Sequence, residues 1–225
     1  MPRAGGVAGL FDAAVVEDVL ADEADESLLW PEEEAALGPV VAGRRRDYVL
    51  GRRCARLALE RLGREPAPVL RGPERQPLWP DGVVGAITHT AGYAAAVVAT
   101  ADRARSVGID AEPDEPLPRG VLGRIARPED RRWLEGPGGR PEAVGVAHPE
   151  RLLFTIKEAV YKAWYPLAGR WLGFGDAHVT LDPAHRRFEV GIEVAGPVST
   201  MSGRYTTVGG FVVAGIELPP PPGPS

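Results

Sequence analysis

Apolar side chains recur every three to four residues in two long stretches of the chain. In residues 44–62 they fit one face of a helix, and Gly63 suits the end of that helix. In residues 148–168 a broader apolar face of Leu, Ile, Val, Ala and Trp side chains has the same spacing. We therefore predict one long amphipathic helix in each half of the chain.

Shorter apolar runs, alternating or continuous and separated by turn residues, predict β-strands. A shorter helix, interrupted near Pro128, is expected over residues 122–134, and a Gly/Pro-rich loop over 135–149. The strands are expected at residues 83–88, 93–99, 106–110, 177–181, 188–194 and 205–218.

These elements predict an α+β fold built as a pseudo-twofold pair of similar halves. Each half is expected to be a long helix against a small, mostly antiparallel sheet. We divide the chain at a polar joint near residue 103, into an N-terminal half (1–103) and a C-terminal half (104–218). The Pro-rich segment 219–225 is predicted to be a disordered tail.

Composition excludes several protein classes. The chain has 225 residues and one cysteine, Cys54, so a disulfide framework and a Cys-rich metal site are excluded. No run of eighteen apolar residues occurs, so we expect no membrane-spanning helix. The first residues lack the basic and apolar regions of a signal peptide, so we expect a cytoplasmic protein.

Charge is distributed unevenly along the chain. Residues 12–34 hold ten acidic and no basic residues, whereas the rest of the chain has 26 basic and 21 acidic residues. The net charge of −5 does not indicate nucleic-acid binding. Outside residues 12–34, however, the chain has a net positive charge, which suits anionic partners.

The basic residues are 24 arginines and only two lysines, Lys157 and Lys162. Both lie in one helix with Glu158, and Glu158 and Lys162 share a face because they are four residues apart. An ordinary helix salt bridge would explain this pair. A compact ammonium is also a good point-charge partner for a phosphate, which would explain why lysine occurs only here.

Two further groups have the chemistry of a phosphate site. Asp110 and Glu112 are expected on one face of a strand, about 7 Å apart, where hard carboxylate oxygens suit Mg²⁺. A solvated strand end is the alternative. Thr88 ends a buried strand and His89 follows it, where both could hold phosphate oxygens. Arg44 and Arg52 lie two helical turns apart, where they could hold a polyphosphate or form a solvated face.

Taken in order, these motifs resemble a known enzyme family. They are G-R-R-C-A-R-L-A-L, P-L-W-P-D-G-V-V-G-A-I-T-H-T, S-V-G-I-D-A-E and L-F-T-I-K-E-A-V-Y-K-A. From about residue 44 to residue 166 the chain resembles the surfactin-type 4′-phosphopantetheinyl transferases, in the branch that includes the enterobactin-synthase-associated enzyme.

The resemblance implies a monomer with coenzyme A between its halves. The reaction would move 4′-phosphopantetheine from coenzyme A to a serine of an acyl or peptidyl carrier protein and release 3′,5′-ADP. The residues that match the family's Mg²⁺ ligands are Asp110, Glu112 and Glu158. Those that match its coenzyme A contacts are Arg44, Arg52, Arg75, Thr88, His89, Lys157 and Lys162.

Within that reaction, Glu158 is the preferred base for the serine proton, and Glu112 is the alternative. Lys157, Lys162 and His89 would stabilise charge on the leaving group. A basic, partly apolar surface could bind an acidic carrier protein. Alternatively, the same residues form a solvated helix face. Its residues are Arg119, Arg124, Arg127, Arg131 and Arg132, with Leu117, Val121 and Leu122.

Two other functions remain open at this point. The same carboxylates could serve a Mg²⁺-dependent phosphohydrolase that acts on a nucleotide without a carrier protein. Alternatively, the chain could bind carrier proteins without catalysis, although the retained carboxylates and lysines argue against that.

Overall fold

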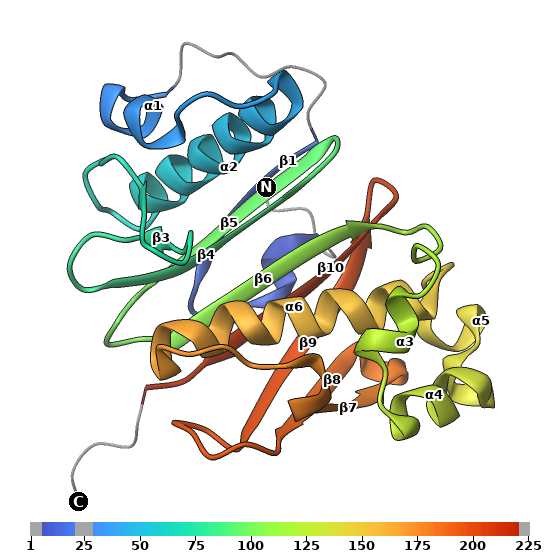
Figure 1. The fold of residues 1–225 in the computed structure, drawn as a ribbon. Coiled ribbons are helices and arrows are strands. Elements are labelled where there is room, and N and C mark those ends of the chain that lie inside the picture. Colours follow the sequence, from blue (N-terminus) through green and yellow to red (C-terminus); the bar gives the residue numbers. More distant parts are fainter. Residues whose placement is uncertain (1–5, 21–28, 221–225) are drawn as a thin grey trace, which may run out of the picture.

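The computed structural model describes residues 6–20 and 29–220, which form two lobes (Figure 1). In each lobe a long helix covers an antiparallel sheet. The first lobe contains η1 (Val7–Leu10), β1 (Val15–Leu20), α1 (Pro31–Leu37), α2 (Ala42–Arg61), β2 (Leu70–Arg71), β3 (Pro77–Leu78), β4 (Val83–Thr90) and β5 (Tyr93–Thr100). The second contains β6 (Ser106–Pro113), α3 (Val121–Ile125), α4 (Pro128–Glu135), η3 (Pro137–Gly139), α5 (Pro141–Val144), α6 (Pro149–Ala168), η4 (Phe174–Asp176), β7 (Ala177–Asp182), η5 (Pro183–His185), β8 (Arg187–Ile192), β9 (Thr200–Val208) and β10 (Phe211–Leu218).

The sheet of the first lobe has the strand order β1-β5-β4, with all neighbours antiparallel. The central strand β5 is buried along nearly its whole length, and its run of small alanines lets helix α2 pack closely on one face. On that face Ala94, Ala96 and Val98 contact a buried stripe of α2, which consists of Leu50, Cys54, Ala55, Ala58 and Leu59.

The sheet of the second lobe has the order β6-β10-β9-β8-β7. Helix α6 lies across one face of it, and the short helices α3, α4 and α5 gather near the N-terminal end of α6 (Figure 1). The apolar stripe of α6 is fully buried against the sheet, because nearly every third or fourth position carries a large aliphatic or aromatic side chain.

The two lobes meet where β4 lies beside β6 (Figure 1). One hydrophobic cluster crosses this junction and contains Ala95 and Val97 of β5 together with Val107 and Ile109 of β6. The junction is therefore a packed core, and it sets the ends of β4 and β6 at fixed positions next to each other.

The predicted α+β class and both long helices are confirmed: the helices are α2 and α6. The predicted strand 205–218 is instead a hairpin of β9 and β10. Gly209 and Gly210 have φ angles of +54° and +85°, which make the two-residue turn that the apolar pattern did not reveal.

Two other regions are more regular than the sequence indicated. The acidic N-terminal region contributes the edge strand β1, in which the adjacent Glu17 and Asp18 are flanked by apolar side chains. The expected loop 135–149 contains η3 and α5. Of the predicted tail 219–225, residues from 221 onward lie outside the described part of the chain.

Residue 103 lies in the turn between β5 and β6, and the proposed division at 103 stays a prediction. Within residues 6–20 and 29–220, no helix is long and apolar enough to cross a membrane.

Gly108 should be essential for the packing of β6 on α6. A Cβ atom at this position would overlap the carbonyl oxygen of Ala159 and lie 3.0 Å from the backbone nitrogen of Ala163. Ser106 Oγ on the same strand donates a hydrogen bond of 2.8 Å to Ala163 O, so the strand lies directly on the helix backbone. We expect Gly108→Ala to lower the free energy of unfolding by about 3 kcal/mol, as measured by urea denaturation.

Gly43 provides the matched control, since it lies in α2 and a Cβ atom there would meet nothing within 4 Å. Gly43→Ala should leave stability unchanged or raise it by less than about 1 kcal/mol. Equal stabilities of the Gly108→Ala protein and the wild type would show that β6 and α6 can move apart without lowering the free energy of unfolding.

Candidate active site

Asp110 lies at the lobe junction and links β4, β6 and α6. Its Oδ1 accepts hydrogen bonds from Thr88 Oγ1 at 3.1 Å and from Lys162 Nζ at 2.7 Å. Thr88 Oγ1 also accepts a hydrogen bond from Ala111 N, which secures β4 to β6. Asp110 Oδ2 is buried without a hydrogen-bond partner among the described residues, so one oxygen of this carboxylate is left for a ligand.

Glu112 stands two residues further along β6 and pairs with Arg151 of α6. The distance between Glu112 Oε2 and an Arg151 terminal nitrogen is 3.1 Å. Burial, and then the charge of Asp110, raise the pKa of Glu112 to about 7, although Arg151 and Lys162 oppose this shift. Arg151 also donates to the carbonyl oxygens of Glu115 and Pro116 and so holds the chain that follows β6.

Glu158 projects from α6 into a cavity between the lobes. Burial, and then the charge of Asp110, raise the pKa of Glu158, while Lys162 opposes the shift. Asp110 therefore acts electrostatically on both other predicted metal ligands, and the structure brings the three carboxylates into one electrostatic group.

The carboxylate group fits a hard divalent cation in its chemistry. It offers oxygen ligands, an orphaned buried oxygen on Asp110, and mutual repulsion that a cation would relieve. Among the described residues, however, no three His, Cys, Asp or Glu side chains already stand in a metal-binding arrangement. The Mg²⁺ site thus stays a prediction.

Arginines of the first lobe gather around Tyr48 of α2. The guanidinium carbons of Arg52 and Arg71 lie 4.3 and 4.2 Å from the centre of the Tyr48 ring. Arg52 is 5% exposed, and its Nε donates to Val69 O at 2.6 Å, which ties α2 to the segment before β2. Arg44 acts on the same cluster. Burial is the main cause that lowers the pKa of Arg71, and the positive charge of Arg44 lowers it further.

His89 at the end of β4 lies between these cations and Lys162. Burial, and then the charges of Lys162, Arg44 and Arg52, lower the pKa of His89 to about 4. The imidazole is therefore neutral at physiological pH, and it can donate a hydrogen bond to an anion without carrying a charge.

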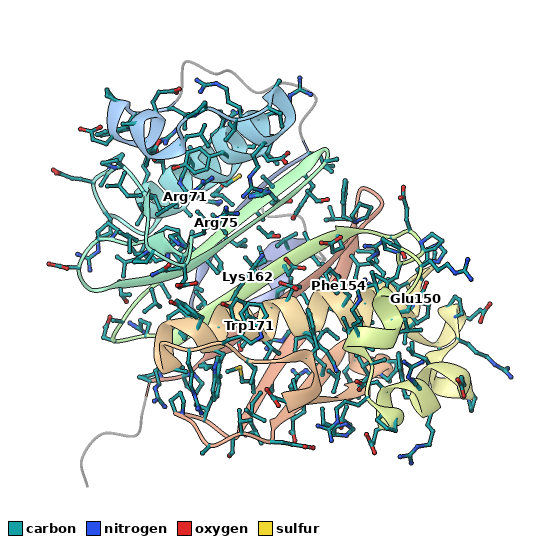
Figure 2. All side chains as sticks on the ribbon, viewed as in Figure 1. Arg71, Arg75, Glu150, Phe154, Lys162 and Trp171 are labelled. Carbon is teal, nitrogen blue, oxygen red and sulfur yellow. The ribbon has the colours of Figure 1, made fainter. Side chains whose placement is uncertain are left out.

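A cavity of about 540 Å³ separates the β2–β3 and β4 region from α6. Glu158, Tyr161 and Lys162 line it from α6, and Arg75 and Trp79 from the first lobe. Arg75 has a φ angle of +65°, a strained conformation for an arginine, in the turn between β2 and β3. Figure 2 labels Arg71 and Arg75 on the upper lobe and Lys162 on α6 below them.

The structure does not bring Lys157 together with this group. Its side chain is 1% exposed, its ammonium is held by three protein acceptors, and it does not line the cavity. The other predicted site residues gather at the lobe junction, on α2, β4, β6, α6 and the β2–β3 turn.

Sequence reasoning missed Tyr48, Arg71 and Arg151. Tyr48 lies four residues from both Arg44 and Arg52, and Arg151 lies two helical turns before Glu158, so a shared helix face was an available signal for both. Arg71 had no such signal, because its position over Tyr48 depends on how β2 returns towards α2.

Two family models match the chain. Residues 32–99 match the 4′-phosphopantetheinyl transferase N-terminal domain, and residues 106–200 match the 4′-phosphopantetheinyl transferase superfamily. Both matched regions contribute side chains to the group around Asp110.

Individual relatives also match the chain, two of them over most of their length and a third over about half of it. The chain is 44% identical to the 4′-phosphopantetheinyl transferase PptT of Mycobacterium tuberculosis, over 94% of this chain and 97% of that protein. It is 44% identical to Svp of Streptomyces mobaraensis, over 93% and 87%. Enterobactin synthase component D of Salmonella typhi is 31% identical over 62% of this chain and 56% of its own length.

These matches confirm the predicted family and its transferase activity. They agree with the two-lobed α+β fold and with the order of the motifs along the chain. The chain belongs to the 4′-phosphopantetheinyl transferase superfamily.

Proposed function

We propose that the cavity at the lobe junction binds coenzyme A and that the chain transfers its 4′-phosphopantetheine to a serine of an apo carrier protein. The observation that carries this is one cavity lined by charged side chains from both lobes: Arg75 of the first lobe, and Glu158 and Lys162 of α6, of which Lys162 pairs with Asp110. Such a site holds the phosphates of the donor at one side and the reacting hydroxyl at the other.

Arg44, Arg52, Arg71 and Arg75 would hold the phosphates of coenzyme A. Guanidinium groups suit this task because their planar forks bind phosphate oxygens bidentately. Lys162 and the neutral imidazole of His89 would stabilise the charge that develops on 3′,5′-ADP as the pyrophosphate bond breaks.

Glu158 is the preferred group to accept the serine proton as the new oxygen–phosphorus bond forms. Its pKa is raised by burial, and it lines the cavity, whereas Glu112 is engaged by Arg151. Glu112 remains the alternative, since its pKa of about 7 also suits a base at neutral pH.

Asp110, Glu112 and Glu158 would hold Mg²⁺, which neutralises pyrophosphate charge when it is bound. Thr88 and Lys162 both donate hydrogen bonds to Oδ1 of Asp110 and so orient this carboxylate. Both cavity walls come from one chain, so we propose that a monomer suffices; the cytoplasmic location stays a prediction.

The carrier protein would dock at α3 and α4. Arg119 and Arg124 are exposed there, and Leu117 and Leu122 line a hollow of about 350 Å³ beside Arg119. Arg127 and Arg132 are less available, because they pair with Glu193 and Glu129. A partly apolar hollow beside free cations suits an acidic helical partner.

The central experiment is to incubate the protein with coenzyme A, Mg²⁺ and an apo carrier protein. Intact-mass spectrometry should show a gain of roughly 340 Da on the carrier and release of 3′,5′-ADP. Carriers from fatty-acid, polyketide and peptide synthesis should each be offered, with a serine-to-alanine carrier as the control.

Hydrolysis of coenzyme A or ADP without any carrier would favour the phosphohydrolase hypothesis. Tight carrier binding without a mass gain on any carrier would favour the binding hypothesis. Either result would overturn the proposed transfer.

Magnesium should stabilise the protein more at about pH 8 than at about pH 5.5. The folded-state pKa of Glu112, about 7, exceeds its reference value of 4.5. The stability that this group contributes is therefore present below pH 4.5 and is lost as the pH rises through 7. A cation bound to the ionised group restores it, so Mg²⁺ should raise the melting temperature by about 3–5 °C at the higher pH and by less at the lower one.

The control is Glu112→Gln, in which the pH dependence of the Mg²⁺ effect should shrink. A melting temperature that Mg²⁺ leaves unchanged at both pH values would argue against a metal at these carboxylates.

A further inference from the structure

Lys157 Nζ is completely enclosed by protein acceptors. It donates hydrogen bonds to Asp130 Oδ2 at 2.7 Å, Ile125 O at 2.8 Å and Phe174 O at 3.0 Å. An ammonium has three N–H groups, so all of them are in use. The side chains of Lys157 and Asp130 are each 1% exposed, which leaves no approach for a phosphate.

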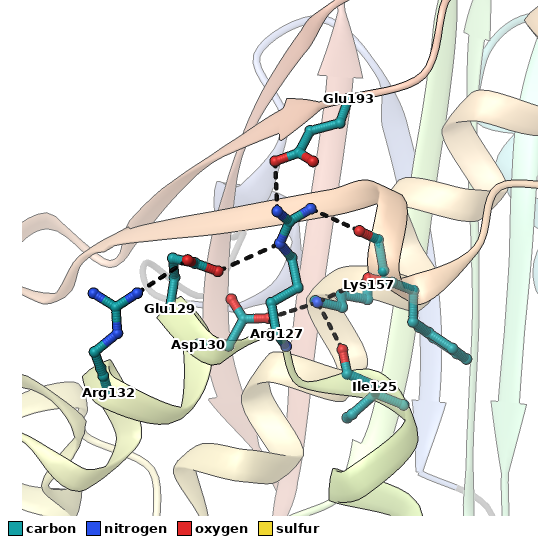
Figure 3. A network of polar contacts seen from close by, with 9 residues as sticks. Ile125, Arg127, Glu129, Asp130, Arg132, Lys157 and Glu193 are labelled. Carbon is teal, nitrogen blue, oxygen red and sulfur yellow. Dashed lines mark hydrogen bonds and ion pairs between the residues drawn. The ribbon is translucent and has the colours of Figure 1, made fainter.

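The three acceptors come from different segments that cover one flank of α6. Ile125 ends α3, Asp130 lies in the first turn of α4, and Phe174 begins η4 (Figure 3). Asp130 Oδ2 also accepts a hydrogen bond of 2.9 Å from Arg127 N at the start of α4. One buried carboxylate therefore both caps α4 and fastens it to α6.

Arg127 makes a second attachment for the same helices. It donates to Gly175 O at 2.6 Å and pairs with Glu193 at 2.7 Å, beyond the end of β8 (Figure 3). This attachment lies nearer the surface than the Lys157–Asp130 pair, so solvent weakens it more. The Lys157–Asp130 pair is the contact that connects α4 directly to α6.

The position of Lys157 gives this connection a functional meaning. It directly precedes Glu158, whose side chain enters the cavity, whereas the exposed Arg124 lies in α3 and the exposed Arg119 just before α3. We propose that Lys157 is a positioning residue, which with Asp130 fixes the carrier-docking helices α3 and α4 relative to Glu158 and does not contact coenzyme A. This rests on the proposed function, because it assigns α3 and α4 to the carrier.

The test compares Lys157→Met with Asp130→Asn, which removes the partner charge and keeps its shape. Coenzyme A affinity is measured by calorimetry, and KM and kcat are measured separately for coenzyme A and the carrier below the melting temperature of every variant. We expect coenzyme A binding within about threefold of the wild type and a KM for the carrier at least tenfold higher in both variants, with the double variant no worse than either single one. Arg103→Met, in the exposed turn between β5 and β6, is the control for loss of a cation.

Hydrogen exchange gives a readout that needs no activity. In both variants the amides of residues 121–135 should exchange faster, while those of α2 and β5 should keep wild-type protection. If the wild type modifies no carrier, the proposed function fails, and exchange and coenzyme A binding still test the attachment.

Three results would overturn the proposal. The first is a tenfold weaker affinity for coenzyme A in Lys157→Met but not in Asp130→Asn, which would place the ammonium on the donor. The second is unchanged exchange over residues 121–135. The third is wild-type carrier kinetics in both variants. If Lys157→Met does not fold, Asp130→Asn tests the proposal through the second and third results, and either of them overturns it.

Discussion

Replacing Asp110 with asparagine should reduce the transfer rate by roughly a thousandfold while the protein stays folded. The substitution keeps the shape of the side chain and the acceptor for Thr88 and Lys162, but it removes the charge. It also turns the orphaned Oδ2 position into a poor cation ligand. The rate is measured as mass gain on an apo carrier protein, and folding by the melting temperature.

A second measurement on this variant does not depend on activity. The charge of Asp110 raises the pKa of both Glu112 and Glu158, so the pKa of both should fall in Asp110→Asn, as followed by carboxyl NMR. Asp81→Asn, in the exposed turn before β4, is the control and should behave as the wild type. Transfer near the wild-type rate in Asp110→Asn would mean that the carboxylate group is not the reacting centre.

Replacing Lys162 with arginine should reduce kcat by roughly ten- to a hundredfold although the charge is kept, and Lys162→Met should reduce it further. Lys162 Nζ lies 2.7 Å from Asp110 Oδ1 and lines the cavity beside Glu158. A guanidinium is wider and planar, so it cannot occupy the same point between the carboxylate and a phosphate oxygen. Steady-state kinetics with a carrier protein give the comparison.

Arg103→Lys is the control for exchange of one cation for another on the surface, and it should change neither rate nor stability. Equal kcat values for Lys162→Arg and the wild type would show that only the charge matters. The restriction of lysine to one helix would then have no catalytic cause.

The carboxylate side of the site could be predicted from sequence because its residues are related by local geometry. Glu158 and Lys162 share a helix face, and Asp110 and Glu112 lie two residues apart on one strand, so spacing alone sets each pair. The long helices were predictable for the same reason, since 3.6-residue periodicity extends over about twenty residues in each.

The hairpin of β9 and β10 shows that the apolar pattern has to be combined with turn residues. Both strands are rich in apolar and β-branched residues, so their apolar pattern runs through residues 205–218 without marking the break. The Gly209-Gly210 pair between the two runs is the local signal for a two-residue turn, and the positive φ angles and the pairing of β9 with β10 confirm that it reverses the chain.

The sequence by itself determined the α+β class, the two long helices, the family and the acidic and basic residues that are candidates for a phosphate site. The tertiary structure decided which cations reach that site. It placed Arg71 over Tyr48. It also enclosed Lys157 among three acceptors outside the cavity that its neighbour Glu158 lines. Spacing fixes which residues share a face of one element, but packing between segments distant in the sequence decides what that face meets.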